Sequence, residues 1–507
     1  MAWTSTGLLL ALVLLAYTAA STIKSWHRLR HIPGPPGVGY SKWWLLRNTL
    51  GGHLHLATKA ACKEYGPLVR VGPNQVVTND PDVLRRIWAV RSPYKKGPFY
   101  DAVRFDPERD NLISMRNDTL HAELRAKMAF GYGGKDNDNL EAAIDKEILD
   151  FVDLLERKYL STATEYRPVD LARKVQYLTL DVISALAFSK RFGFMEKDDD
   201  LYSYIKMTEE ALPAMMFMCL FPWLAKVLQS KICRRLLPSE HDPVGFGRFI
   251  AVAKQVVHDR LESDQPKRRD MLGSFLAHGL TREEAQGETL LQIIAGSDTT
   301  ATALRTTMLY LMSSPATYFR LTQEIRGAVA EGRISSAVVT DAEARELPYL
   351  QAVIKEGMRI NPPVAGTMDV VVPEGGDTIC GYAVPGGTEV GCSEFGAQQL
   401  ASVFGPDADV FRPERWLEAE AAAKAGSQLD SDRLRQMNLT WGLIFKAGKW
   451  QCLGKEVALI ELNKVFVELL RRYDFTLVNA SKPWHSMNAG IFIQSDLFTK
   501  ITRAEPL

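Results

Sequence analysis

A single cysteine near the end of the chain lies in a loop whose residue types favour metal ligation. Residues 445–455, FKAGKWQCLGK, place Cys452 between Gly448 and Gly454 and among lysines. A lone cysteine is most often a small buried hydrophobe. Here, however, the glycines permit a tight turn, and the N-terminus of the helix expected after the loop favours a thiolate. A nucleophilic thiolate needs a base, and the local sequence has no histidine, so the loop favours a metal ligand.

A second group of polar residues interrupts an apolar helix pattern. Residues 290–312 are largely apolar, but AGSDTT stands in their middle at 295–300. Glycine leaves room beside a helix and weakens it by about 1 kcal/mol, and threonine hydroxyls can bond to the carbonyl one turn earlier. The pattern could be a polar surface turn. Because apolar runs flank it on both sides, we favour a buried polar notch able to pass protons.

A third group consists of charges. In KEGMR, Glu356 and Arg359 are three residues apart and share one helical face, as an ordinary ion pair would. Such pairs usually contribute little. Arg415, in FRPERW, lies among prolines and aromatics, where a third charge could turn the pair into a buried network.

The elements that must position these groups are mostly helices. Residues 67–78 alternate as one hairpin, and residues 139–293 are dominated by helical periodicity. Residues 211–228 are unusually apolar with a break at Pro222, and could be a buried helix pair or a methionine-rich pocket lid. Short strands and turns follow Pro362, and residues 454–475 form a strong amphipathic helix pattern. The sequence therefore predicts a mainly α domain with a minor β-sheet.

Composition excludes several classes of protein. The chain has 507 residues, of which 46% are hydrophobic and 24% charged, so it can bury a sizeable core. The formal net charge of +1 gives no support for a nucleic-acid partner. Its 6 cysteines are too scattered for a disulfide framework, which favours a reducing compartment.

The N-terminus predicts a membrane anchor. No charged residue precedes Lys24, and an apolar helix of that length spans about 34 Å, enough for a hydrocarbon core of about 30 Å. A cleaved signal peptide is the rival interpretation, but no basic residue precedes the apolar run. Basic residues follow it, which predicts a cytosolic domain. We assign residues 1–31 to a single transmembrane helix with its basic flank and 32–507 to the catalytic domain, joined by a proline-rich hinge at 32–37.

In this order and spacing, these elements resemble the cytochrome P450 haem-thiolate monooxygenases over essentially the whole chain. The cysteine loop is similar to the family pattern at Phe445, Gly448, Cys452 and Gly454. The resemblance implies the cytochrome P450 fold and haem b as the cofactor. It also implies that Cys452 is the axial ligand of the iron, with a thiolate that favours O–O cleavage.

The same resemblance implies roles for residues elsewhere in the chain. Asp298 and Thr299 would be the proton-delivery pair, with Ala295 and Gly296 beside the haem. Arg415 would complete a structural triad with the Glu356–Arg359 pair. The remaining implied residues are His121 and Arg125 for the haem propionates, and Lys127 and Lys455 for a cationic face that docks an acidic electron donor. For the two lysines, an ordinary solvated charged surface is the alternative.

Two positions depart from the family. Trp450 stands where the family commonly has a basic residue bonded to a propionate, and Val370 stands where relatives often carry an arginine. An indole N–H donates one hydrogen bond but cannot form the bidentate pair of arginine. We therefore expect Trp450 to pack against the haem edge, and His121 with Arg125 to hold more of the propionate charge.

The expected activity is oxidation of a lipophilic small molecule by O2, with electrons from NADPH through cytochrome P450 reductase. The expected location is the endoplasmic reticulum membrane, in contact with membrane lipid and with the catalytic domain in the cytosol. Residues 448–475 and 486–497 resemble the fungal branch that includes pisatin demethylase. That branch implies tailoring of secondary metabolites such as terpenoids or polyketides. The expected pocket combines the segment before His121 with residues 215–221, 291–295, 364–368 and 487–492.

Two rival functions keep the haem. One is a haem-thiolate isomerase or dehydratase that needs neither O2 nor NADPH, and the other is a non-catalytic membrane haem-binding protein. The intact Asp298–Thr299 pair argues against both.

Overall fold

The computed structural model describes residues 20–134, 136–137, 140–262, 269–335 and 337–505. Most of the expected membrane anchor lies outside these residues, and the described part begins with a helix over residues 20–29. Among the described helices none alone has the length and apolarity to cross a bilayer. One pair, Leu201–Leu220 with Pro222–Leu228, passes that test jointly but is bent by 115°.

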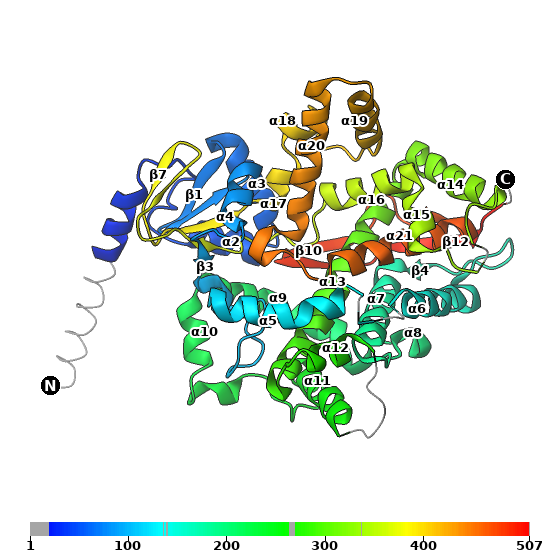
Figure 1. Ribbon diagram of the computed structural model, residues 1–507, viewed down its shortest axis with the longest axis horizontal. Helices are drawn as coiled ribbons and strands as arrows, with labels where there is room; N and C mark the ends of the chain where they lie inside the picture. Colours follow the sequence, from blue (N-terminus) through cyan, green and yellow to red (C-terminus); the bar gives the residue numbers. More distant parts are fainter. Residues whose placement is uncertain (1–19, 135, 138–139, 263–268, 336, 506–507) are drawn as a thin grey trace.

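Helices make up most of the molecule, as the sequence predicts (Figure 1). They are α2 (Trp43–Leu50), α3 (Leu54–Tyr65), α4 (Pro81–Trp88), α5 (Asp118–Tyr132), α6 (Leu140–Leu154), α7 (Leu171–Phe188), α8 (Phe194–Lys197), α9 (Tyr204–Leu220), α10 (Pro222–Leu228), α11 (Gly245–Leu261), α12 (Met271–Ala277), α13 (Arg282–Met312), α14 (Pro315–Ala330), α15 (Asp341–Arg345), α16 (Pro348–Ile360), α17 (Glu394–Gln398), α18 (Ala401–Phe404), α19 (Glu414–Lys424), α20 (Gln428–Gly442) and α21 (Lys455–Arg472).

The strands form small sheets. They are β1 (Leu68–Gly72), β2 (Gln75–Thr78), β3 (Lys95–Lys96), β4 (Val169–Asp170), β5 (Val370–Val371), β6 (Asp377–Ile379), β7 (Tyr382–Val384), β8 (Glu389–Cys392), β9 (Tyr473–Leu477), β10 (His485–Ala489), β11 (Ile491–Ser495) and β12 (Phe498–Arg503). The predicted hairpin is confirmed as β1 and β2, which belong to a five-stranded sheet of order β1-β2-β8-β5-β3. This sheet joins strands from residues 68–96 to strands from residues 370–392.

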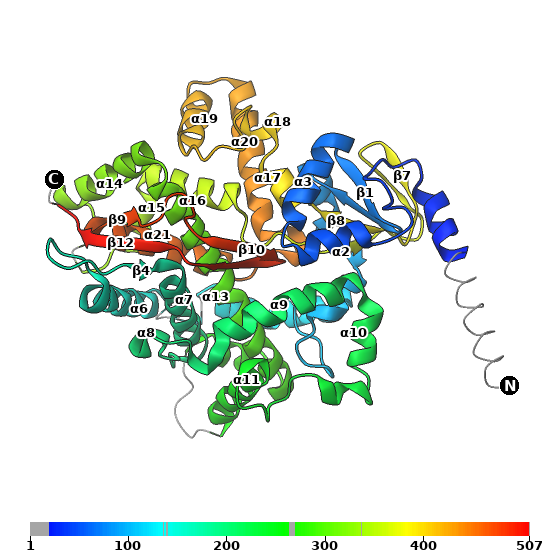
Figure 2. The same ribbon diagram turned by 180° about the vertical axis from the view of Figure 1, so that it is seen from behind.

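The central element is α13, a helix of 31 residues that runs through the helical bulk (Figures 1 and 2). Thr281 and Glu284 form a capping box that defines its first turn. The helix packs against α7, α11, α16 and α21. Because neighbours cover it on several sides, Ser297, Asp298 and Thr300 are buried and Thr299 is half-buried, so residues 295–300 are not a polar surface turn.

Of two further sequence expectations, one differs in detail and one is confirmed. The helix expected over 454–475 ends at Arg472 as α21, and Tyr473 begins β9, where pairing with β12 satisfies the backbone. The apolar segment with Pro222 forms α9 and α10, which break at Phe221 as predicted. In Figure 2 both helices lie on the near face, with α9 beside α2.

The proline-rich segment is docked against the sheet. Ile32 is buried, and the Arg70 guanidinium donates to the carbonyls of Trp26, Ser25, Gly39, Gly72 and Pro73. One side chain thus ties residues 25–39 to strand β1.

Candidate active site

The Cys452 loop is a tight turn held by backbone contacts. Gly448 has φ +56°, and a Cβ there would lie 2.2 Å from the Trp88 carbonyl oxygen, so only glycine fits. The Cys452 N–H donates to the Phe445 carbonyl at 2.8 Å. Phe445 is buried, and Gly454 directly precedes α21. The thiol therefore stands at the N-terminus of a long helix, as the sequence predicts.

Opposing effects act on the thiol. The surface of Cys452 is accessible, but protein atoms lie densely around its thiol, and this burial raises the pKa of the thiol. The N–H groups of Gly454 and Lys455 and the charge of Arg125 act in the opposite direction. A metal ion bound to the sulfur would deprotonate it outright. In the part of the chain that the structure describes, no three His, Cys, Asp or Glu residues gather as a metal site.

The residues near the thiol fit a group with negative charges. The indole Nε1 of Trp450 is buried and has no hydrogen-bond partner, although such donors almost always have one. Among the described residues Arg125 has no ion pair or hydrogen bond, and burial lowers its pKa. Burial lowers the pKa of His121 to about 3, and the charges of Lys96, Arg125 and Lys449 act in the same direction. An anionic group such as a haem propionate fits these donors.

Two lysines of the loop point inward. Lys446 Nζ pairs with Glu394 at 2.9 Å and lies over the Trp88 ring. Lys449 Nζ donates to the Ser92 and Tyr94 carbonyls and to Asp118 at 2.9 Å. These cations brace the loop against the rest of the protein.

The two lysines expected on a docking face are partly exposed. Lys127 pairs with Glu284 at 3.0 Å, and Lys455 lies 4.0 Å from Glu456. Each therefore has a carboxylate neighbour of its own.

The polar notch of α13 divides into two faces. Thr299 is half-buried, and its hydroxyl donates to the Ala295 carbonyl at 2.9 Å. Asp298 is buried and accepts hydrogen bonds from Tyr204 Oη at 2.6 Å and from Gln176 Nε2 at 3.0 Å. Burial raises the pKa of Asp298, and the Tyr204 hydroxyl opposes that rise. The carboxyl group is thus held toward α7 and α9.

Gly296 lies where α13 approaches α7. A Cβ there would lie 2.8 Å from Ile183 Cδ1. The glycine therefore permits close helix packing, whereas its neighbour Ala295 stays partly accessible.

The three charges of the predicted network meet in the core. Glu356 pairs with Arg359 at 2.7 Å and with Arg415 at 3.0 Å, and all three side chains are 0% exposed. The carboxylate also accepts from Trp416 Nε1 and from the Arg412 N–H. The two arginines hold the pKa of Glu356 below its usual value, although burial alone would raise it. The network joins α16 to α19 and the turn before it.

The segments expected to line a pocket converge. Val364 forms an isolated antiparallel β-bridge with Ile491, and the Ala365 N–H donates to the Gly490 carbonyl. Strand β11 lies beside α13. One apolar cluster joins four of the five expected segments, and its methionines and isoleucines are Ile113, Met215, Met216, Met218, Met368, Met487, Ile491 and Ile493. Among the described residues these segments thus form an apolar cluster rich in methionine, a side chain that fits irregular shapes; we call it the apolar lining of the expected pocket.

Several partners were beyond sequence reasoning. Tyr204 and Gln176, which bond Asp298, lie 94 and 122 residues away from it in the chain. Lys96 and Glu288 are buried without any motif around them. The alternation of a short strand could have indicated that Lys96 is buried. No local pattern indicates the burial or the partners of Tyr204, Gln176 and Glu288.

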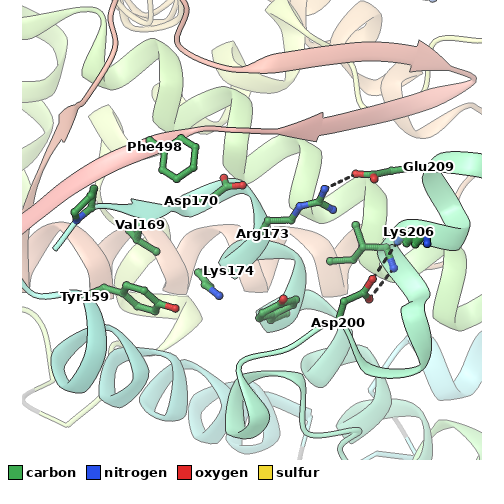
Figure 3. A pocket seen from close by; sticks show the side chains of 12 residues that line it. Tyr159, Val169, Asp170, Arg173, Lys174, Asp200, Lys206, Glu209 and Phe498 are labelled. Atoms are coloured by element: carbon green, nitrogen blue, oxygen red, sulfur yellow. Dashed lines mark hydrogen bonds and ion pairs between the residues drawn. The ribbon is translucent and has the colours of Figure 1, made fainter.

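A surface hollow of about 480 Å³ lies outside the Asp298 region, between α7, the start of α9 and β12 (Figure 3). Its walls carry the Arg173–Glu209 ion pair and Asp200, which accepts the N–H groups of Ile205 and Lys206. Positive and negative groups alternate around it, so it presents no single charge to a ligand.

Comparison with known proteins agrees with this geometry. The model of the family described as Cytochrome P450 matches residues 33–501. The chain is 41% identical to cytochrome P450 monooxygenase ABA1 of Pyricularia oryzae, over 99% of this chain and 97% of that protein. It is 36% identical to cytochrome P450 monooxygenase aba1 of Botryotinia fuckeliana, over 94% and 92%.

A solved structure shares the fold. The crystal structure of the cytochrome P450DA heme domain superposes with a TM-score of 0.72 at 16% identity, and covers 94% of this chain and 98% of that one. Members of this family are monooxygenases that bind haem through a cysteine thiolate. The chain belongs to the cytochrome P450 family.

Proposed function

We propose that this chain is a membrane-anchored haem monooxygenase that oxidises a lipophilic small molecule, with Cys452 as the axial ligand. The observation that carries the assignment of the site is the unpartnered buried indole N–H of Trp450 beside the cysteine loop. When bound, the haem supplies activation of O2. NADPH-dependent cytochrome P450 reductase would supply the electrons, docking near Lys127 and Lys455.

The protein's part is to hold the haem and deliver protons. Trp450 Nε1 and the Arg125 guanidinium would bind the propionates, while His121 stays neutral at pH 7 and can donate one hydrogen bond. The Asp298 carboxyl and the Thr299 hydroxyl would hold and pass protons, and the triad of Glu356, Arg359 and Arg415 would keep the core rigid.

The substrate is proposed to be apolar. The methionine-rich lining described above adapts to irregular shapes and offers few charged groups. The relatives named above are fungal monooxygenases. Together these support a tailoring step on a terpenoid or polyketide in fungal secondary metabolism.

The proposed location is the endoplasmic reticulum membrane, with the catalytic domain in the cytosol. In addition to the N-terminal apolar run, large apolar side chains are exposed on and after α10, where Trp223 is 64%, Ile232 87% and Leu236 78% exposed. Flotation with phospholipid vesicles tests this. The full chain should float, a chain lacking residues 1–31 should float weakly, and a full chain that stays at the bottom contradicts the anchor.

The experiment that tests the function is an absorption spectrum of the dithionite-reduced, carbon-monoxide-bound protein, wild type and Cys452→Ser. A strongly red-shifted Soret band in the wild type alone supports thiolate ligation. Substrate turnover should then require both NADPH and O2. Turnover without either would support an isomerase or dehydratase, and a band at the position of histidine-ligated haem would refute Cys452 as the ligand.

A further inference from the structure

Asp298 is surrounded by a set of buried hydrogen bonds that links three helices. Its Oδ2 accepts from Tyr204 Oη at 2.6 Å, and its Oδ1 accepts from Gln176 Nε2 at 3.0 Å. Gln176 Oε1 accepts in turn from Arg305, whose Nε donates to the Ala172 carbonyl. All of these side chains are buried. Both oxygens of the carboxyl group are therefore engaged by α7 and α9.

Tyr204 is the first residue of α9, and its backbone position is tightly defined. The two preceding residues, Tyr202 and Ser203, both have positive φ, of 58° and 56°. Asp200 accepts the N–H groups of Ile205 and Lys206, which caps the helix (Figure 3). The ring of Tyr204 packs edge-on against Phe249 of α11, with centroids 4.8 Å apart. A shift of the start of α9 would therefore carry the Tyr204 hydroxyl with it.

The same helix reaches the apolar lining. Leu212 and Met216, two and three turns beyond Tyr204, belong to the cluster with Met487 and Ile491. Helix α9 thus touches the proposed substrate pocket with its second half and Asp298 with its first residue. A ligand that displaces Met216 acts on one end of α9, whose other end bonds the carboxyl group, with Pro213 between the two.

We propose that Tyr204 is a positioning residue for Asp298. Through α9, Tyr204 couples the state of the pocket to the orientation and proton affinity of the Asp298 carboxyl group. The inference rests on the proposed function, in which Asp298 holds and passes a proton. With Tyr204 bonded, the carboxyl group faces α9. When α9 moves, Oδ2 loses the Tyr204 donor and keeps only the Ser297 hydroxyl at 3.3 Å, so the carboxyl group binds a proton more tightly and is no longer tied to α9.

The charged groups around the carboxyl are few. Arg305, on α13, bonds the far side of the Gln176 amide. The other charges that act on Arg305 are Asp170, Arg173 and Glu209, which border the surface hollow. From α11, the packing partner is the apolar ring of Phe249. Tyr204 is therefore the neighbour on α9 whose removal changes the carboxyl directly.

The test is the infrared carbonyl band of the protonated Asp298 carboxyl, identified by subtracting Asp298→Asn from the wild type and followed against pH. Tyr204→Phe removes one hydroxyl and keeps the ring. Because a hydrogen bond to the charged form favours it, the midpoint should rise by about one unit in this variant. Gln176→Met should shift the midpoint in the same direction. Tyr159→Phe is the control, because it removes an equally short Tyr–Asp hydrogen bond, to Asp198, elsewhere.

The pH profile of turnover should shift with the infrared midpoint in Tyr204→Phe, and less product should form per NADPH consumed. An unchanged midpoint in Tyr204→Phe, with the carbon monoxide spectrum of the wild type intact, overturns the positioning role of Tyr204 and leaves the monooxygenase standing. Absence of NADPH- and O2-dependent turnover in the wild type refutes the proposed function instead, and the infrared midpoint still tests the hydrogen bond.

Discussion

Trp450 and Val370 are the two residues at which this chain departs from the family pattern. Val370 is buried in the sheet, and Lys96 lies directly across from it in the pairing of β3 with β5. Lys96, Arg125 and Lys449 all act on His121, so positive charge surrounds the same place from three elements. Cations from elsewhere in the sequence thus stand near the place where the family has its two basic residues.

The indole N–H of Trp450 can be tested alone. Replacing Trp450 with Phe removes the donor and keeps a ring. Because a hydrogen bond to a charged group contributes about 1.5–3 kcal/mol, we expect haem transfer to apomyoglobin to become about ten-fold faster or more. Trp441→Phe is the control, since its N–H donates to the Lys355 carbonyl. Equal transfer rates in wild type and Trp450→Phe would contradict a propionate contact.

Arg125 offers a second test at the same scale. Its guanidinium has no anionic partner among the described residues, so Arg125→Ala removes charge without breaking an internal ion pair. We expect the fraction of purified protein that carries haem to fall severalfold, measured by the ratio of Soret to protein absorbance. Lys127→Ala, on the same helix but paired with Glu284, should retain the wild-type fraction. Full haem occupancy in Arg125→Ala would show that the propionates are held by other residues.

At the scale of elements, the contact between α13 and α7 depends on Gly296. In Gly296→Ala the new methyl group would meet Ile183, and overpacking of this kind costs about 1–3 kcal/mol. Gly287→Ala on the same helix meets nothing within 4 Å, so it should be neutral or stabilising by about 1 kcal/mol. Thermal unfolding of both variants measures the difference. Adding Ile183→Ala to Gly296→Ala should cost less than the sum of the single changes, and strict additivity would contradict the contact.

A second contact between elements clamps the segment that precedes α5. Glu288 on α13 accepts the Leu112 N–H at 2.7 Å, and Lys96 Nζ donates to the carbonyls of Leu112 and Ile113. Ile113 belongs to the apolar lining. A buried acid and a buried base thus hold one wall of the proposed pocket.

This clamp predicts a dependence of stability on pH. Burial raises the pKa of Glu288 from 4.5 to about 8, so the folded protein keeps a proton that the unfolded chain loses. Wild-type stability contributed by this group therefore falls as pH rises from about 4.5 to about 8. In Glu288→Gln the side chain does not titrate, so this decrease in stability is absent. The free energy of unfolding of Glu288→Gln relative to wild type should therefore rise with pH, by up to about 1.4 kcal/mol per pH unit.

Urea unfolding of Glu288→Gln and wild type between pH 6 and 8 measures the difference. Lys96 acts in the opposite direction, because burial lowers its pKa to about 7, and it is present in both proteins. Curves that stay parallel over this range would show that Glu288 is ionised in the folded state.

At the scale of the whole molecule, the Glu356 network holds distant parts together. Glu356→Ala would leave Arg359 and Arg415 buried without their anion, which costs about 3–5 kcal/mol. We expect a much lower melting temperature by circular dichroism, and haem loss together with unfolding. Glu418→Ala breaks the partly exposed Arg412–Glu418 pair and should cost at most about 1 kcal/mol. Equal melting temperatures in the two variants would contradict a structural role.

The sequence by itself determined what depends on neighbours along the chain. Periodicity predicted the helices, Pro222 predicted the break between α9 and α10, and the glycines around Cys452 predicted the tight loop. Each follows from local sterics, because turn geometry and helix periodicity involve residues only a few positions apart.

Only the tertiary structure decided which side chains meet. The sequence offered Asp298 as a proton carrier, but the fold turned its carboxyl toward Tyr204 and Gln176. Arg415 joined Glu356 from 59 residues away, and Trp450 became a buried donor. Contacts of this kind arise when helices pack, and packing depends on the shape of every neighbouring surface at once. Local spacing therefore indicated the candidate site residues, and the packing of α7, α9 and α13 decided where one of them points.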